Sequence, residues 1–228
     1  MLQRAAILLA AMAFAQQTSL ESLRRSMVHD QIEKRGVTQP DVLRAMRKVP
    51  RHLFIPESLQ EHAYADHPLP IGEGQTISQP YIVAFMTELL RPSPTASVLE
   101  IGTGSGYQCA VLAEIFDEVY SIEIIPELAR LAKSRLASLG YRNVHLRTGD
   151  GYEGWQEKAP FDRIVLTAAP PEVPAALIDQ LAKGGRLVAP VGPTSETQYL
   201  VVIDRRRDGT LVRRTLDAVR FVPMVEAR

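Results

Sequence analysis

Three glycines on alternate positions, Gly102, Gly104 and Gly106, stand between a short apolar stretch at 97–101 and a helical pattern. In an open α/β sheet, a ligand crosses the strand ends at such a strand–turn–helix junction, because glycines let the backbone approach it closely. The dinucleotide-binding pattern has its third glycine one residue later, where this chain has Tyr107. A plain tight turn also uses glycines, so other residues must decide between the two readings.

Strand and helix patterns alternate around this junction. Apolar spacing predicts a helix from Pro80, helices over 107–116, 126–140 and 173–182, and strands over 97–101, 118–123, 143–147, 161–167 and 186–191. This repetition predicts an α/β fold: a doubly wound, mostly parallel, Rossmann-like sheet with helices on both faces. Two strands over 198–206 and 210–222 surround Asp208-Gly209 and predict an antiparallel hairpin at the edge.

The first part of the chain has a different organisation. Residues 19–48 predict two packing helices broken at 36–38, with Thr38 as the cap of the second helix. Residues 49–80 are rich in proline and show no sustained period, but apolar residues are interleaved through them. We therefore expect an ordered irregular loop there, of the kind that is usually functional when it lies in a compact domain.

The charge balance and the cysteine count exclude several classes of protein. The 26 basic and 26 acidic residues cancel, which argues against binding of nucleic acid or anionic lipid through bulk charge. Cys109 is the only cysteine, and the five histidines lack the spacing of metal ligands. We therefore expect no metal, no nucleic-acid partner and no stable association with a membrane.

Residues 1–15 have the pattern of a signal peptide, with Arg4 before an apolar run that closes on Ala13-Phe14-Ala15. As a helix, this apolar run would span about 16 Å, well short of the roughly 30 Å of a bilayer core. A frayed helix, or a true start at Met27, would give the same pattern. Export and a cytoplasmic location therefore both stay open.

Acidic residues at successive strand ends favour a ligand over a plain turn. Glu123 ends the strand after the glycine loop, where a carboxylate can accept hydrogen bonds from both ribose hydroxyls. Asp150 closes the third strand and could bracket an adenine amino group. Glu100 would repel a pyrophosphate but suit a sulfonium or ammonium, which favours S-adenosylmethionine over a nicotinamide cofactor. The alternative without a ligand is that the Glu is an ordinary surface residue and the Asp an ordinary turn residue. The predicted cofactor residues are Glu100, Gly102, Thr103, Gly104, Ser105, Gly106, Glu123, Asp150 and Gly151.

Three segments resemble motifs of class I S-adenosylmethionine-dependent methyltransferases: residues 98–106, Val-Leu-Glu-Ile-Gly-Thr-Gly-Ser-Gly, and the later stretches 161–167 and 181–188. A longer motif narrows the class. Residues 66–80, Asp-His-Pro-Leu-Pro-Ile-Gly-Glu-Gly-Gln-Thr-Ile-Ser-Gln-Pro, resemble the signature of the protein-L-isoaspartate O-methyltransferases. The resemblance covers nearly all of 19–225 and departs only at the front end, because that family usually lacks residues such as 1–15 and is usually cytoplasmic.

The resemblance implies transfer of a methyl group to the α-carboxylate of L-isoaspartyl residues, which initiates protein repair. It implies that Ser78 is the active residue, with Gln75, Thr76, Ile77 and Gln79 beside the acceptor and Gln198 on the substrate main chain. An acceptor carboxyl with a pKa of about 4 is ionised at neutral pH, so no strong general base is needed. Ser78 could also cap the helix that begins at Pro80.

The resemblance implies that the substrates are isoaspartyl-containing peptides and flexible protein segments. We expect the protein to be a monomer. We expect one methyltransferase domain over 19–228, with N-terminal helices and a substrate loop over 19–80, a cofactor-binding core over 81–192 and C-terminal strands over 193–228. Alternatives are a nicotinamide-dependent oxidoreductase of Rossmann type and a methyltransferase acting on another acceptor. The oxidoreductase would want a Tyr-x-x-x-Lys proton donor, which the sequence lacks.

Overall fold

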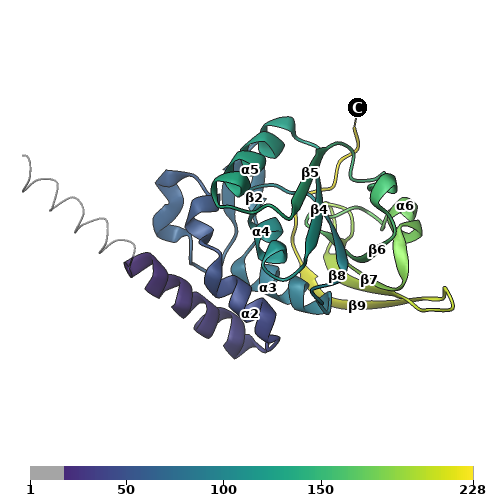
Figure 1. Cartoon of the computed structure of the whole chain (residues 1–228), viewed down its shortest axis with the longest axis horizontal. Coiled ribbons are helices and arrows are strands. Elements are labelled where there is room, and N and C mark those ends of the chain that lie inside the picture. The colour runs from purple at the N-terminus through teal and green to yellow at the C-terminus, as the bar shows by residue number, and fades with distance from the viewer. Residues whose placement is uncertain (1–17, 228) are drawn as a thin grey trace, which may run out of the picture.

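The computed structural model describes residues 18–227, and the signal-like segment 1–15 lies outside the described residues. Within that part, seven strands form one sheet in the order β5-β4-β3-β6-β7-β8-β9 (Figure 1). The strands are β3 (Ser97–Ile101), β4 (Glu118–Glu123), β5 (Val144–Thr148), β6 (Phe161–Leu166), β7 (Leu181–Val191), β8 (Gln198–Arg205) and β9 (Leu211–Val219). The helices packed around it are α2 (Pro40–Lys48), α3 (Pro80–Leu89), α4 (Tyr107–Ala113), α5 (Pro126–Ser138) and α6 (Ala175–Asp179).

The sheet is wound in two directions from its centre. β3 pairs in parallel with β4 on one side and with β6 on the other. The chain runs outward through β4 and β5, then returns across the sheet to β6 and β7. At the far edge β7, β8 and β9 are antiparallel, which confirms the predicted hairpin and the predicted fold class. The carboxyl end of β3 is therefore the switch point at which such sheets bind ligands.

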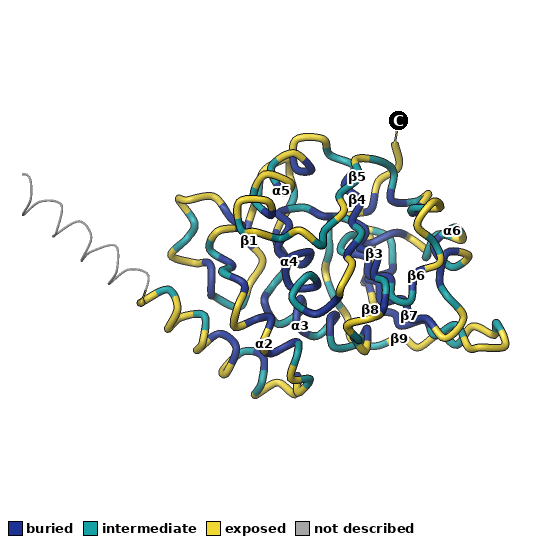
Figure 2. Tube along the Cα trace, viewed as in Figure 1, coloured by how far each residue is buried: buried dark blue, intermediate teal, exposed yellow. Residues whose placement is uncertain are grey.

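Side chains alternate between the two faces of the central strands and fill two separate cores. Figure 2 shows the buried stretches of the chain along the sheet and the helices beside it. Val98, Val119 and Val165 face the cluster covered by α2 to α5, whereas Leu99 and Ile122 face the cluster that contains Leu177 of α6. Helices therefore cover both faces, as the apolar spacing predicts. Because alternate residues of a strand share a face, Glu100 lies on the same face as Val98, under α4.

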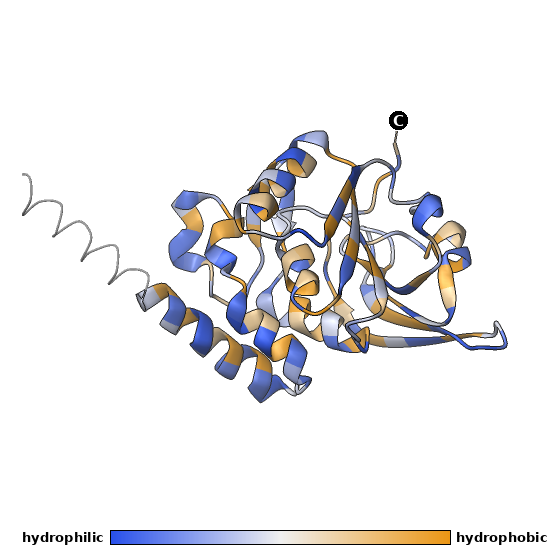
Figure 3. Ribbon diagram, viewed as in Figure 1, coloured by the Kyte–Doolittle hydropathy of each residue, from blue (hydrophilic) through white to orange (hydrophobic). Residues whose placement is uncertain are grey.

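The N-terminal helices are present as predicted, with one local difference. Residues 18–35 are helical and end at Gly36, whose φ of 94° is left-handed. The second helix, α2, is capped by Gln39 rather than by Thr38, because the Gln39 side chain accepts from the Val42 backbone N–H. The helix at 18–35 alternates hydrophilic and hydrophobic patches (Figure 3), as a helix packed on one side does.

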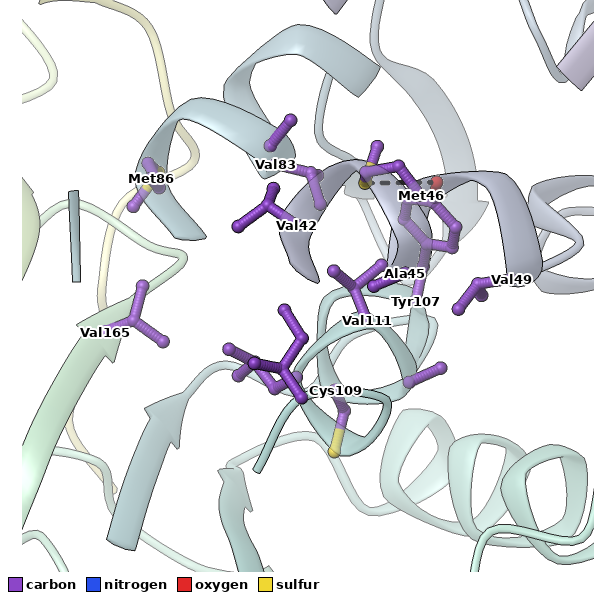
Figure 4. Packing of buried hydrophobic residues seen from close by; sticks show 14 of the residues in the cluster. Val42, Ala45, Met46, Val49, Val83, Met86, Tyr107, Cys109, Val111 and Val165 are labelled. Carbon is purple, nitrogen blue, oxygen red and sulfur yellow. Dashed lines mark hydrogen bonds between the residues drawn. The ribbon is translucent and has the colours of Figure 1, made fainter. Parts of the chain in front are cut away.

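The segment at 49–80 is ordered. It forms 3-10 turns at Arg51–Phe54 and Glu57–His62 and then the two-stranded ribbon of β1 (Leu69–Gly72) and β2 (Gln75–Ile77). Arg51 is wholly buried, donates to the Ala63 carbonyl at 2.8 Å and lies 5.0 Å over the Tyr107 ring. Phe54 also packs against the Tyr107 ring, and Tyr107 in turn contacts Met46 of α2 (Figure 4), so α4 contacts both this segment and α2.

Several element bounds differ from the prediction. α4 and β9 each end three residues early, at Ala113 and Val219, and the largest difference is at β7. β7 begins at Leu181, five residues before the predicted start, because Leu181 pairs with Phe161 before a register shift that contains Gly184-Gly185. α6 is correspondingly short and ends at Asp179. Among residues 18–227, no helix is both long enough and apolar enough to cross a bilayer.

Candidate active site

A cavity of about 830 Å³, open to solvent, lies at the carboxyl ends of β3 and β4. Four segments far apart in the sequence line it: the ribbon residues 75–78, the glycine loop at 102–105, the end of β4 at 122–125 and the C-terminal segment 222–225. The cavity coincides with the switch point of the sheet, where the sequence predicts a ligand.

The glycine loop requires its glycines. Gly102, Gly104 and Gly106 all have positive φ, at 97°, 53° and 87°. A Cβ on Gly102 would also lie 2.4 Å from the Thr167 hydroxyl oxygen. That hydroxyl donates to the Gly102 carbonyl at 2.5 Å, so the loop is held tightly against the end of β6. Gly102 and Gly104 line the cavity, whereas Gly106 packs behind it against Leu136.

Glu123 lies in the cavity wall as predicted. Its side chain is 5% exposed, and its two oxygens accept backbone N–H groups from Gly104 at 2.7 Å and from Ile125 at 3.0 Å. These bonds fix the carboxylate against the glycine loop. An ionised carboxylate can accept about four hydrogen bonds, so each oxygen keeps capacity for one hydroxyl donor. The arrangement fits the vicinal hydroxyls of a ribose.

The structure corrects the expectation for Asp150. Its carboxylate does not line the cavity; one oxygen accepts from the Tyr152 backbone N–H and the other from that of Ala227, both at 2.8 Å. The neighbouring Gly151 does line the cavity, and a Cβ there would lie 2.4 Å from Cγ2 of Ile101. Asp150 thus fixes the turn and the C-terminal segment that form this wall, instead of presenting its carboxylate to a ligand.

Glu100 is also corrected. Its side chain is wholly buried on the α4 face of the sheet, outside the cavity lining, and bonds the Ser121 hydroxyl at 2.5 Å. Burial raises its pKa from 4.5 to about 8, with a smaller contribution from Glu123 in the same direction. At neutral pH the group is therefore mostly uncharged and does not supply the negative charge that the sequence suggests.

Two predicted substrate residues are engaged elsewhere. Gln198 is 3% exposed, and its amide both donates to and accepts from the backbone of Phe221. It therefore holds the C-terminal segment and does not reach the cavity. Gln79 also lies outside the lining, and its amide donates to Asp66 at 2.8 Å.

Ser78 lines the cavity with the three preceding predicted residues, Gln75, Thr76 and Ile77. It is half-buried, and its hydroxyl makes no hydrogen bond to any described residue. It does not cap α3, because the N-cap position is Gln79 and no side chain caps that helix. The Ser78 hydroxyl is thus free for a ligand on the side of the cavity formed by β2.

Sequence reasoning missed much of the far wall. The C-terminal segment is tied to the turn after β6, since Ala169 donates to the Val222 carbonyl and accepts from the Met224 N–H, both at 2.9 Å. No periodicity or charge pattern marks these residues as part of a site. Lining residues outside the prediction include Val83, Tyr107, Gln108, Ile124, Thr167, Ala168, Val222, Pro223, Met224 and Val225.

A doubly wound sheet, a glycine loop and a carboxylate suited to a ribose define a class I S-adenosylmethionine-dependent methyltransferase. The family model described as "Protein-L-isoaspartate(D-aspartate) O-methyltransferase (PCMT)" matches residues 22–228. The chain belongs to this family. The family uses S-adenosylmethionine to methylate isoaspartyl residues, which excludes the nicotinamide-dependent alternative. Within the described residues, no three His, Cys, Asp or Glu side chains are grouped so as to hold a metal ion.

Relatives and solved structures agree with this assignment. A protein-L-isoaspartate O-methyltransferase of Synechococcus sp. (strain JA-2-3B'a(2-13)) is 57% identical over 90% of this chain and 86% of its own length. That of Gloeobacter violaceus is 55% identical over 89% and 98%. A solved protein-L-isoaspartate O-methyltransferase is 31% identical with a TM-score of 0.78, over 87% of this chain and 65% of its own. A Plasmodium falciparum protein assigned to the same enzyme class, solved with S-adenosyl-L-homocysteine, is 25% identical with a TM-score of 0.77, over 90% and 99%.

Proposed function

We propose that the chain transfers the methyl group of S-adenosylmethionine to the α-carboxylate of L-isoaspartyl residues in damaged peptides and proteins, and so initiates their repair. The observation that carries the proposal is that Glu123 and Ser78 line the same cavity. Glu123 offers a carboxylate for a ribose, and Ser78 offers a free hydroxyl beside the motif of the acceptor. The two halves of a group transfer can therefore meet in a single site.

On the cofactor side, we assign the ribose hydroxyls to the two oxygens of Glu123. The glycine-loop residues Thr103 and Ser105 line the same cavity, and we assign the amino-acid end of the cofactor to them. Gly151 and Met224 also line it, and we assign the adenine ring to that part of the cavity. When bound, S-adenosylmethionine supplies an electrophilic methyl group on a positively charged sulfur.

On the acceptor side, the residues of this chain have to hold an anion in place and exclude water. The isoaspartyl carboxylate is already ionised, so the protein need not remove a proton from it. It must bring one oxygen to about 3 Å from the methyl carbon, in line with the departing sulfur. Ser78 fits this task by donating its hydroxyl to the other carboxylate oxygen, while Thr76 and Ile77 border the acceptor.

Substrate recognition has to read an altered backbone instead of one side chain. We propose that flexible segments enter along β2, and that the enzyme acts on them as a monomer whose residues 19–228 form one domain, without nucleic acid and without stable association with a membrane. The methyl ester product closes to a succinimide, which opens partly to normal aspartate.

The location of the protein depends on whether residues 1–15 are removed as a signal peptide. N-terminal sequencing of the protein from fractionated cells tests this.

A transfer assay with matched peptides tests the function. We expect labelled methyl from S-adenosylmethionine to reach a peptide that contains L-isoaspartate and not its twin with normal aspartate. The label should be base-labile, as a methyl ester is. Equal labelling of both peptides would point to a methyltransferase with another acceptor and would overturn the proposal.

A further inference from the structure

Three side chains form a continuous hydrogen-bonded chain from the buried face of the sheet to the cavity wall. Glu100 and Ser121 are both 0% exposed, and the Ser121 hydroxyl lies 2.5 Å from Oε2 of Glu100. The same hydroxyl lies 2.6 Å from Oγ1 of Thr103, in a contact in which either oxygen can be the donor. Thr103 lines the cavity. A change at Glu100 can therefore reach the cofactor without contact between Glu100 and the cavity.

The state of Glu100 decides which way these hydrogen bonds point. The groups that act on its pKa are Ser121, Cys109 of α4 and Glu123, and none of the three is positively charged. With its pKa at about 8, Glu100 is mostly protonated at neutral pH. Its second oxygen, Oε1, is buried and has no hydrogen-bond partner among the described residues. A proton there would be an unsatisfied buried donor, so the proton belongs on Oε2, where Ser121 can accept it.

The direction then follows along the chain. If Oε2 carries the proton it can donate to Ser121, and Ser121 can then donate to Thr103, which leaves the proton of the Thr103 hydroxyl without a partner in the described part of this chain. An ionised Glu100 only accepts, so Ser121 and Thr103 would both turn inward and Thr103 would present only lone pairs.

We propose that Glu100 is a positioning residue that acts through Ser121 to aim the Thr103 hydroxyl at the carboxylate of the cofactor's amino-acid end. This rests on the proposed function. The ribose hydroxyls are donors and suit Glu123, whereas the cofactor carboxylate is an anion that needs donors. A hydroxyl held in the donating direction before binding avoids reorientation of buried dipoles when the cofactor enters.

The test is the affinity for S-adenosylhomocysteine between pH 6.5 and 9, measured by calorimetry. In the wild-type protein, we expect the Kd to rise about tenfold as Glu100 ionises, which corresponds to loss of one hydrogen bond to a charged group. Glu100→Gln cannot ionise and still carries a donor, so this rise should vanish. Ser121→Ala interrupts the chain and should weaken binding about tenfold at pH 7, and Ser121→Thr should restore it.

Two controls separate this effect from others. Ser97→Ala removes a hydroxyl at the opposite end of β3, where it bonds Asp162, and should leave the pH profile unchanged. 5′-Methylthioadenosine lacks the amino-acid end, so its affinity should not vary with pH by this route. The inference is overturned if Glu100→Gln keeps the wild-type profile, or if folded Ser121→Ala binds as tightly as wild type. Failure of the wild-type protein to bind S-adenosylhomocysteine would instead overturn the proposed function and the inference with it.

Discussion

Asp66 and Gln79 are joined across the acceptor motif: Oδ2 of Asp66 accepts from the Gln79 amide at 2.8 Å. The same oxygen accepts from Arg35 at 2.7 Å, and the Arg35 guanidinium stacks 3.4 Å over the Tyr81 ring. Gln79 immediately follows Ser78, so the position of the Ser78 hydroxyl, which we propose contacts the acceptor, depends on a carboxylate outside the cavity.

We therefore expect Asp66→Ala to impair acceptor use and not cofactor binding. Loss of the anchor frees Gln79 and loosens Ser78, so kcat/KM for the isoaspartyl peptide should fall about tenfold. Calorimetry should show an unchanged Kd for S-adenosylhomocysteine. Asp30→Ala, which removes an exposed ion pair with Lys34 on the N-terminal helix, is the matched control and should change neither value.

Ser78→Ala should lower kcat for the isoaspartyl peptide by about ten- to a hundredfold, because one donor to the acceptor carboxylate is lost. The Kd for S-adenosylhomocysteine should stay within twofold of wild type. Ser138→Ala, on the exposed side of α5, serves as the control. A wild-type kcat in Ser78→Ala would remove Ser78 from the mechanism.

Glu123→Ala should weaken S-adenosylhomocysteine binding by about a hundredfold, since two charge-assisted hydrogen bonds to the ribose are lost together with two bonds that fix the loop. Glu118→Ala is the control in the same strand, where the carboxylate is exposed and contacts His145. If both variants bind equally well, the ribose assignment is wrong.

Gly151 and Gly149 offer a matched pair on either side of Asp150. A Cβ on Gly151 meets Ile101 at 2.4 Å and Met224 at 3.1 Å, whereas one on Gly149 meets nothing closer than 3.5 Å. Gly151→Ala should therefore cost about 1–3 kcal/mol of stability and narrow the cavity, so that both the Tm and the cofactor affinity fall. Gly149→Ala should leave both unchanged. Equal Tm values in the two variants would contradict this account of the wall.

The raised pKa of Glu100 also predicts how the stability of the protein depends on pH. Its pKa is raised from 4.5 to about 8 on folding, so the folded state holds this proton more tightly than the unfolded state does. Stability from this group is complete below pH 4.5 and is lost as the pH rises toward 8, with a slope of up to about 1.4 kcal/mol per pH unit. The Tm of Glu100→Gln minus that of wild type should therefore grow between pH 5 and pH 8. A constant difference across this range would show that Glu100 keeps an ordinary pKa.

The fold class could be predicted from sequence, because short buried stretches such as 97–101 recur between segments of helical spacing, and proline or glycine stands at several helix ends. The largest difference from the predicted bounds, at β7, lies where Gly184-Gly185 interrupts a strand without ending it. Local patterns carry no information about a bulge whose two sides both pair with β6.

The site was only partly predictable, for a related reason. Glu123, Gly102 and Gly104 line the cavity as predicted, since a strand end fixes where the next residue lies, whereas their contacts with a cofactor stay a prediction. Glu100, Asp150 and Gln198 were misplaced because strand position does not say which face a side chain takes or which backbone group it bonds. Val222 to Val225 were missed because only the folded chain brings them to β3.

The wall contributed by 222–225 has a consequence for biosynthesis. Every other lining residue precedes this segment in the sequence, and Gln198 and Asp150 hold it in place only after the hairpin of β8 and β9 has formed. A nascent chain that has emerged only as far as β7 therefore has a glycine loop but lacks a closed pocket. We therefore expect the nascent chain to bind the methyl donor only near the end of its synthesis.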